Sequence, residues 1–159
     1  TTVLVEPQMK ATQVPKVLGT DGVQKMGKSL NNHIEMAATA EETLKRVMTM
    51  VTDPARVKRT DPGNPDVCNV FSFHKIFSDQ QTVDMVNVEC RRAGIGCVDC
   101  KKLMGKALNE HLAPFRERRT ELEKNPGYIL DVYRDGARRA GEIARQTISE
   151  VYDAIGMLR

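Results

Sequence analysis

Residues 18–32 read LGTDGVQKMGKSLNN, and the interpretation of the whole chain starts from this stretch. Lys25 and Lys28 lie three positions apart on what we expect to be one short loop. Gly27 lets the backbone approach a ligand, and each lysine carries a compact charge on a flexible stem. Ser29 is placed to cap a following helix, whose N-terminus attracts anions. The stretch indicates either a phosphate-binding site or a solvated turn.

The run from Val14 to Asn32 closely resembles the KMSKS region of class I aminoacyl-tRNA synthetases. Within that class it is most similar to the tryptophanyl-tRNA synthetases. Glu6-Pro7-Gln8 also matches this family, and the resemblance extends through the C-terminal half of the chain. One departure is Gly27, where the motif that names the region has Ser.

The resemblance implies a tryptophan–tRNA ligase. Such an enzyme condenses Trp with ATP, in the presence of Mg²⁺, to tryptophanyl-adenylate and then transfers the aminoacyl group to tRNA(Trp). Lys28 and Lys25 would be catalytic, because they would stabilise the charge that develops as the bond between the α and β phosphates breaks. The residues implied to contact ATP are Lys25, Met26, Gly27, Lys28 and Ser29.

The composition is that of a soluble helical protein. Aromatic residues make up only 4% of the chain, which favours helices over sheets. No apolar stretch is long enough to cross a bilayer, and the first residues do not resemble a signal peptide. The net charge of +3 is too small to require a nucleic-acid partner by itself. The resemblance implies a cytoplasmic location and no membrane partner.

We expect two parts and a mainly α fold. Residues 1–38 begin with the strand-like run Val3-Leu4-Val5 and continue as a long loop. We interpret them as the C-terminal edge of a Rossmann-like α/β nucleotide-binding domain that carries the KMSKS-type loop. Residues 39–159 are predicted to form an all-α bundle, which in the resembled family is the anticodon-binding domain.

Capping signals and apolar periodicity predict the helices of the second part. Thr39 and Glu42 have the spacing of a capping box. Gly94 is expected to close one helix, and Pro114 to bend another. An apolar stripe near the C-terminus, which includes Ile143, predicts core packing. The predicted helices span about 39–51, 69–77, 82–93, 101–124, 128–133 and 135–156.

The only four cysteines follow the pattern C-x21-C-x6-C-x2-C, as Cys68, Cys90, Cys97 and Cys100. Buried free thiols are one interpretation, because an unpaired Cys packs as a small hydrophobe. A disulfide is disfavoured in a cytosolic protein. Glycines just before the C-x-x-C pair let backbone amides turn toward the sulfurs, so we favour a four-thiolate metal site. Zinc and an iron–sulfur cluster both suit four thiolates.

The spacing resembles the C-x22-C-x6-C-x2-C pattern of a subset of tryptophanyl-tRNA synthetases, with a first gap that is one residue shorter. That subset binds a 4Fe–4S cluster, so the resemblance implies this cofactor, with zinc as the alternative, in a structural and tRNA-recognition role. His74 lies six residues after Cys68 and is able to approach the cluster, although four cysteines complete the usual ligand set.

Two groups of basic residues have two interpretations each. Those near the cysteines either offset the charge of the thiolates or form a solvated face; they are Arg91, Arg92, Lys101 and Lys102. Those nearer the C-terminus form either a solvated face or a surface for the tRNA backbone; they are Arg116, Arg118, Arg119, Arg134, Arg138, Arg139 and Arg145.

A class I active site also needs a His-Ile-Gly-His type segment and a tryptophan pocket, and the sequence contains no such segment. We therefore expect a fragment that does not activate Trp alone, and whose missing N-terminal half supplies ATP and Trp contacts in a homodimeric enzyme. The alternative is a non-catalytic tRNA-binding iron–sulfur or zinc module with an idle lysine loop. A single irregular cysteine set makes an electron-transfer protein a weak third interpretation.

Overall fold

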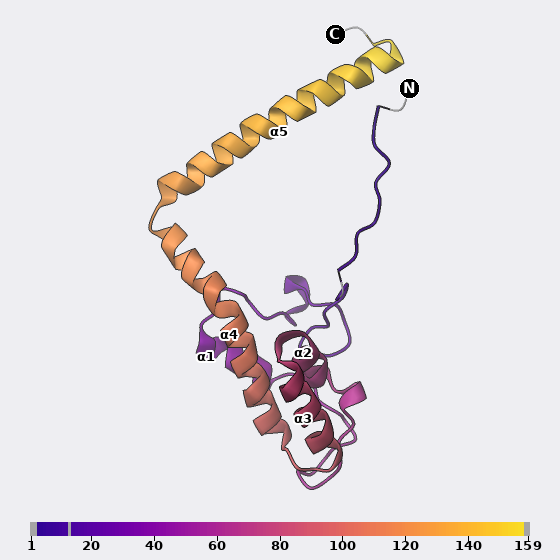
Figure 1. Ribbon diagram of the computed structural model, residues 1–159, viewed down its shortest axis with the longest axis vertical. Helices are drawn as coiled ribbons and strands as arrows, with labels where there is room; N and C mark the ends of the chain where they lie inside the picture. Colours follow the sequence, from indigo (N-terminus) through magenta and orange to yellow (C-terminus); the bar gives the residue numbers. More distant parts are fainter. Residues whose placement is uncertain (1–2, 13, 158–159) are drawn as a thin grey trace. The chain divides into compact units, whose positions relative to one another are not determined.

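The computed structural model describes residues 3–12 and 14–157 (Figure 1). Contacts divide the chain into two compact units. One unit is residues 12–118, and the other comprises the described residues of 1–11 and 119–159. The helices are η1 (Lys28–Leu30), α1 (Ala40–Met48), η2 (Pro65–Val67), α2 (Asn69–Phe77), α3 (Gln80–Arg91), α4 (Cys97–Glu123) and α5 (Pro126–Ile155), of which η1 and η2 are short 3-10 turns.

The predicted capping box opens α1. The Thr39 side chain accepts a hydrogen bond of 3.2 Å from the Glu42 backbone N–H, and the Glu42 carboxylate accepts one of 2.8 Å from the Thr39 N–H. Two of the backbone donors that a helix start leaves free are thereby satisfied, which is why the helix begins at this point. It ends at Met48, about one turn before the predicted end.

Helix α2 spans the predicted residues 69–77 and packs against α3. Asp79 caps α3 by accepting a hydrogen bond of 2.7 Å from the Thr82 N–H, so that helix starts before the predicted residue 82. The prediction that Gly94 closes it is wrong in detail: α3 ends at Arg91, and the left-handed residue after it is Ala93, at φ 59°.

The core of residues 12–118 lies where α1, α2 and the first part of α4 meet. Gly105 of α4 allows a close approach to α1, because a Cβ there would lie 2.7 Å from the Leu44 side chain. Burial of apolar area is the main stabilising contribution to such a core. Its buried aliphatic and aromatic residues are Val47, Met50, Val70, Phe71, Phe73, Val86, Met104, Leu108 and Leu112.

The second unit differs from the prediction. Helix α5 is continuous over Pro126–Ile155, where two helices were expected, because Asn125 caps it and Pro126 is compatible with the first helical position. It ends at Gly156, at φ 69°, close to the predicted end. None of its described residues is buried, and Ile143 is 69% exposed. The predicted core packing of its apolar stripe is therefore wrong within this chain.

The predicted strand Val3-Leu4-Val5 is not formed, and the residues described by the structure contain no strand. The nearest feature is an isolated antiparallel bridge between Leu18 and Lys25. A lone strand has no partner for its backbone groups, so an edge strand needs the rest of a sheet to form. No helix in the described part of the chain is long and apolar enough to cross a membrane.

Candidate functional site

Lys25 lies on a hairpin that precedes η1, and Lys28 is the first residue of η1. The arms of the hairpin are joined by the Gly19 N–H, which donates to the Gln24 carbonyl at 2.8 Å, and by the Met26 N–H, which donates to the Val17 carbonyl at 3.0 Å. The chain reverses at Gly22, whose φ of 69° lies in the left-handed region that glycine adopts readily. The predicted turn-rich loop is thus an ordered hairpin with a defined register.

Asn32 fixes this hairpin from within. It is 3% exposed, and its side chain donates to the Asp21 carboxylate at 2.7 Å and accepts from the Gly27 N–H at 2.8 Å. Asp21 also accepts hydrogen bonds from the Val23 and Gln24 N–H groups. These bonds to the charged form lower the pKa of Asp21. Because the polar groups are paired, the backbone on both sides of the lysines is held in place.

The hairpin and the η1 turn present the two lysines to solvent. Lys25 and Lys28 are both exposed, and within residues 3–12 and 14–157 neither is in an ion pair. Met26 between them is half-buried and packs against the core. The predicted capping role of Ser29 is wrong: Ser29 lies inside η1, whose N-cap is Gly27 without a side-chain hydrogen bond. The two ammonium groups remain available to an anionic ligand.

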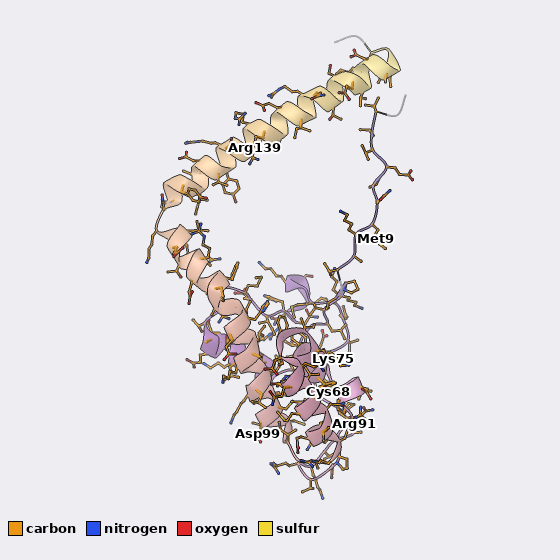
Figure 2. All side chains as sticks on the ribbon, viewed as in Figure 1. Met9, Cys68, Lys75, Arg91, Asp99 and Arg139 are labelled. Carbon is orange, nitrogen blue, oxygen red and sulfur yellow. The ribbon has the colours of Figure 1, made fainter. Side chains whose placement is uncertain are left out.

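The four cysteines come from three helical segments of residues 12–118. Cys68 is the residue before α2, Cys90 lies near the end of α3, and Cys97 and Cys100 occupy the first turn of α4. Cys68 and Cys100 are buried, whereas Cys90 and Cys97 are partly exposed. Figure 2 shows Cys68 where α2 and α3 lie together. The structure places these four side chains in one region of the molecule.

The thiols are near enough to influence one another. Burial, and then the neighbouring thiols of Cys68, Cys90 and Cys97, raise the pKa of Cys100 to about 12. Burial also raises the pKa of Cys90, against a lowering by Arg56. A positive centre is needed to hold such groups as thiolates. Yet no group of three or more His, Cys, Asp or Glu side chains in the described chain has the geometry of a site for a single metal ion.

Two residues next to the cysteines were not identified from the sequence. Gly63 lies against Cys90, because a Cβ there would be 2.6 Å from the sulfur. The Arg56 guanidinium donates to the Cys90 sulfur at 3.9 Å and to the Ile95 carbonyl at 2.8 Å. Neither residue belongs to a recognisable sequence pattern. Together they leave room beside one sulfur and place a cation there.

Comparison with known proteins shows the family of this chain. Residues 4–113 match the family model for tRNA synthetases class I (W and Y). This chain belongs to the class I tRNA synthetases. Tryptophan–tRNA ligases of Aquifex aeolicus, Deinococcus radiodurans and Thermotoga maritima are 44%, 41% and 40% identical to it over 96%, 91% and 98% of its length. The chain spans only 38%, 44% and 48% of those three proteins.

Solved synthetase structures have the same fold. A tryptophanyl-tRNA synthetase from Campylobacter jejuni, crystallised with ADP and tryptophan, superposes with a TM-score of 0.76 at 28% identity, over 91% of this chain and 44% of that one. The synthetase from Aeropyrum pernix superposes with a TM-score of 0.56 over 67% of this chain and 29% of that one. The class I synthetase family is thus supported by sequence and by fold.

In this synthetase chain, many of the predicted basic residues have internal partners. Arg116 of α4 donates to the Thr43 hydroxyl at 2.8 Å and to the Met36 carbonyl at 3.2 Å, so it holds α4 to α1. Arg138 pairs with Asp135 and Glu142 of its own helix. Further examples that pair with a carboxylate are Arg91, Arg92, Arg119, Arg134 and Arg139. These pairs favour the solvated-face interpretation for those residues.

Beside the cysteines lies a pocket of about 290 Å³ with a basic lining. Arg56, Lys58 and Arg59 contribute three cations, and Asp99 contributes one carboxylate. Cys97 lines the same pocket. Of the basic residues predicted to offset the thiolates, Lys101 instead donates to the Met48 carbonyl at 2.9 Å. Arg56, which contacts the Cys90 sulfur, and the two other cations of this pocket come from the loop before η2.

Proposed function

We propose that this chain is the C-terminal portion of a tryptophan–tRNA ligase and carries its KMSKS-type loop. The observation that supports this most directly is the hairpin with the η1 turn that follows it, which expose Lys25 and Lys28 on a backbone fixed by Asn32. Relatives at 40–44% identity carry that activity in their names. The full reaction needs the parts of those relatives that this chain does not span.

The proposed chemistry is electrostatic. Lys28 and Lys25 contact the ATP phosphates, which Mg²⁺ accompanies, and stabilise the charge that develops as pyrophosphate leaves. One preorganised donor aimed at developing charge contributes roughly 100- to 1,000-fold to the rate. Gly27 is extended, and a Cβ there would meet nothing nearer than the Lys25 carbonyl at 3.9 Å, so no side chain stands between the two lysines at this position.

The test replaces Lys28 by Ala in the complete ligase. We expect tryptophan-dependent pyrophosphate exchange to fall by roughly 100- to 1,000-fold, with tRNA binding retained. Lys16→Ala is the matched control, because Lys16 is also an exposed lysine just before the hairpin. Full exchange activity in the Lys28→Ala enzyme would support the alternative, a non-catalytic tRNA-binding module with an idle loop. Exchange by the 159-residue chain alone would contradict the proposal that it is an incomplete enzyme.

We also propose a 4Fe–4S cluster on Cys68, Cys90, Cys97 and Cys100. A single zinc ion, with Zn–S bonds of about 2.3 Å, draws its four sulfurs to within about 4 Å of one another. A cluster binds each sulfur to a different iron and so needs a wider set. Cys68, Cys90 and Cys97 each raise the pKa of Cys100, so the four thiols lie close enough to one another to be candidates for one ligand set. When bound, the cluster supplies cross-links between segments, so its binding free energy becomes folding free energy.

The chain's own residues support this ligand set. Gly63 leaves the space that the Cys90 sulfur occupies, and Arg56 places positive charge beside it. Iron, sulfide and zinc assays on protein purified without oxygen test the proposal, together with a visible absorption spectrum. We expect about four iron and four sulfide per chain for this cluster type. One zinc per chain without sulfide would establish the zinc alternative.

The proposed partner is tRNA(Trp), and we infer that the complete enzyme is a homodimer. The pocket of Arg56, Lys58 and Arg59 offers cations for a phosphate of the tRNA. Arg59→Ala in the complete ligase should weaken tRNA binding and reduce its salt dependence, while pyrophosphate exchange stays unchanged. Unaltered tRNA affinity in that variant would remove this pocket from the interface.

A further inference from the structure

His74 is a buried polar side chain that the proposed reaction does not use. It lies in α2 and is 0% exposed. Its Nε2 atom is 3.2 Å from the carbonyl oxygen of Cys100 and 3.5 Å from the sulfur of the same residue. Its Nδ1 atom is 2.8 Å from the hydroxyl oxygen of Ser78. All the polar atoms of the imidazole therefore have partners, and one partner is a cysteine of the proposed ligand set.

These partners determine where the proton of a neutral imidazole lies. The Cys100 carbonyl can only accept a hydrogen bond, so the Nε2 atom of His74 must carry the hydrogen. Nδ1 is then an acceptor, and the Ser78 hydroxyl donates to it. Ser78 is held in turn, because its backbone N–H donates to the His74 carbonyl at 2.9 Å where α2 ends.

The same Nε2–H faces the Cys100 sulfur. A sulfur accepts hydrogen bonds at longer distances than oxygen, and 3.5 Å is within its range. A hydrogen bond withdraws electron density from a thiolate ligand, and hydrogen bonds to the sulfurs are among the factors that set the reduction potential of a cluster. Cys100 is buried, so water does not compete strongly for this position.

We propose that His74, whose tautomer is fixed by the Cys100 carbonyl and whose ring is held by Ser78, acts as a positioning residue whose Nε2–H orients the Cys100 sulfur and raises the reduction potential of the cluster. This inference rests on the proposed cluster. It gives a role to His74, which is not needed as a ligand because the four cysteines complete the ligand set. His74 donates this hydrogen bond and Ser78 supports it, and both lie toward the C-terminal end of α2. Substitutions at either residue therefore test the same hydrogen bond.

The experiment measures the midpoint potential of the cluster in protein purified without oxygen, by redox titration followed with absorbance and electron paramagnetic resonance. His74→Leu removes the donor, and we expect a more negative potential with the iron content maintained. His74→Gln keeps an N–H donor at the end of a side chain of similar reach, and should restore a potential near that of the unsubstituted protein. Ser78→Ala should give a smaller negative shift, because the imidazole ring loses the hydrogen bond that holds its Nδ1 side in place.

Ser72→Ala is the matched control. Ser72 lies in the same helix, and its hydroxyl donates to the Cys68 carbonyl rather than to a sulfur. The midpoint potential of the cluster in the Ser72→Ala variant should be unchanged. If His74→Leu does not fold, Ser78→Ala decides the question, because Ser78 is only partly buried at the helix end. Equal shifts in the Leu and Gln variants would exclude the hydrogen bond as the cause.

The outcomes separate this inference from the cluster proposal. Full iron and sulfide content with identical potentials in all four variants would refute the role of His74 alone. Shifts in His74→Leu without any in Ser78→Ala would refute the supporting role of Ser78. Absence of iron and sulfide from the unsubstituted protein would refute both the cluster and the role of His74.

Discussion

The side chain of Asn69 donates a buried hydrogen bond of 2.8 Å to the carbonyl oxygen of Gly19, which lies 50 residues earlier in the chain. Gly19 belongs to the lysine hairpin, and Asn69 directly follows Cys68 at the start of α2. The Val51 N–H also donates to the Thr20 carbonyl at 3.0 Å, which gives the hairpin a second tie to the core. The two candidate sites are thus built on one scaffold within residues 12–118.

Loss of the Asn69 side chain should loosen the hairpin. Asn69→Ala leaves the Gly19 carbonyl with only its hydrogen bond of 2.9 Å from the Gly22 N–H, and loss of one hydrogen bond costs about 0.5–1.5 kcal/mol of stability. Urea unfolding of the chain measures this loss. Asn87→Ala removes an amide that bonds Arg91 on the surface of α3, and its effect should stay within about 0.5 kcal/mol. Equal midpoints for the two variants would contradict the role we give to Asn69.

Gly19 and Gly27 should respond differently to the same substitution. A Cβ on Gly19 would lie 2.2 Å from the buried Asn32 side chain, whereas a Cβ on Gly27 meets nothing nearer than the Lys25 carbonyl at 3.9 Å. Forcing atoms into a packed site costs about 1–3 kcal/mol. We expect Gly19→Ala to lower the free energy of unfolding by this amount and Gly27→Ala to leave it almost unchanged. The reverse order in thermal or urea unfolding would disprove the packing argument.

Gly63 should be essential for the cluster rather than for the helices. Ala at this position would press on the Cys90 sulfur, so Gly63→Ala is expected to lower the iron content per chain. The control is Gly136→Ala, where a Cβ in α5 meets nothing within 4 Å and helix propensity improves by up to about 1 kcal/mol. Normal iron content in Gly63→Ala would show that the ligand set tolerates displacement of Cys90.

Acid should open the hairpin at Asp21. Hydrogen bonds from the Val23 N–H and from Asn32 hold the pKa of Asp21 below its ordinary value of 3.8. The stabilisation by this carboxylate is therefore complete above pH 3.8 and is lost as the pH falls through the lower, folded pKa. The amide resonances of Val23 and Gly27 should shift in that acid window. Asp21→Asn should remove the transition, and Asp84→Asn, on the surface of α3, should leave it intact.

Helix α5 should be the least protected long helix of this chain. None of its described residues is buried, and helices without tertiary packing are marginal in water. Hydrogen exchange should be fast along α5 and slow along α2, in which Val70 and Phe73 are at most 2% exposed. Protection of α5 equal to that of α2 in the isolated chain would mean that its apolar stripe is covered, contrary to the structure.

Local signals predicted the helices whose ends are determined by adjacent residues. The capping box at Thr39 placed the start of α1, and the apolar run at 69–77 gave the bounds of α2. Sequence signals that are compatible with more than one local structure gave wrong predictions. Residues 125–127 were predicted to lie between two helices, but Asn125 caps α5 and Pro126 is its first residue. Gly94 was expected to be left-handed, yet Ala93 takes that conformation.

The sequence by itself determined the family, the lysine loop and the set of four cysteines, because these are matters of residue type and spacing. The domain boundary at residue 38, the cytoplasmic location and the cofactor stay predictions. Tertiary structure alone decided what surrounds each site. Asn32 inside the hairpin, Arg56 and Gly63 beside Cys90, and His74 against Cys100 are brought there by contacts between residues far apart in the chain. Those positions depend on how helices pack, which no local pattern encodes.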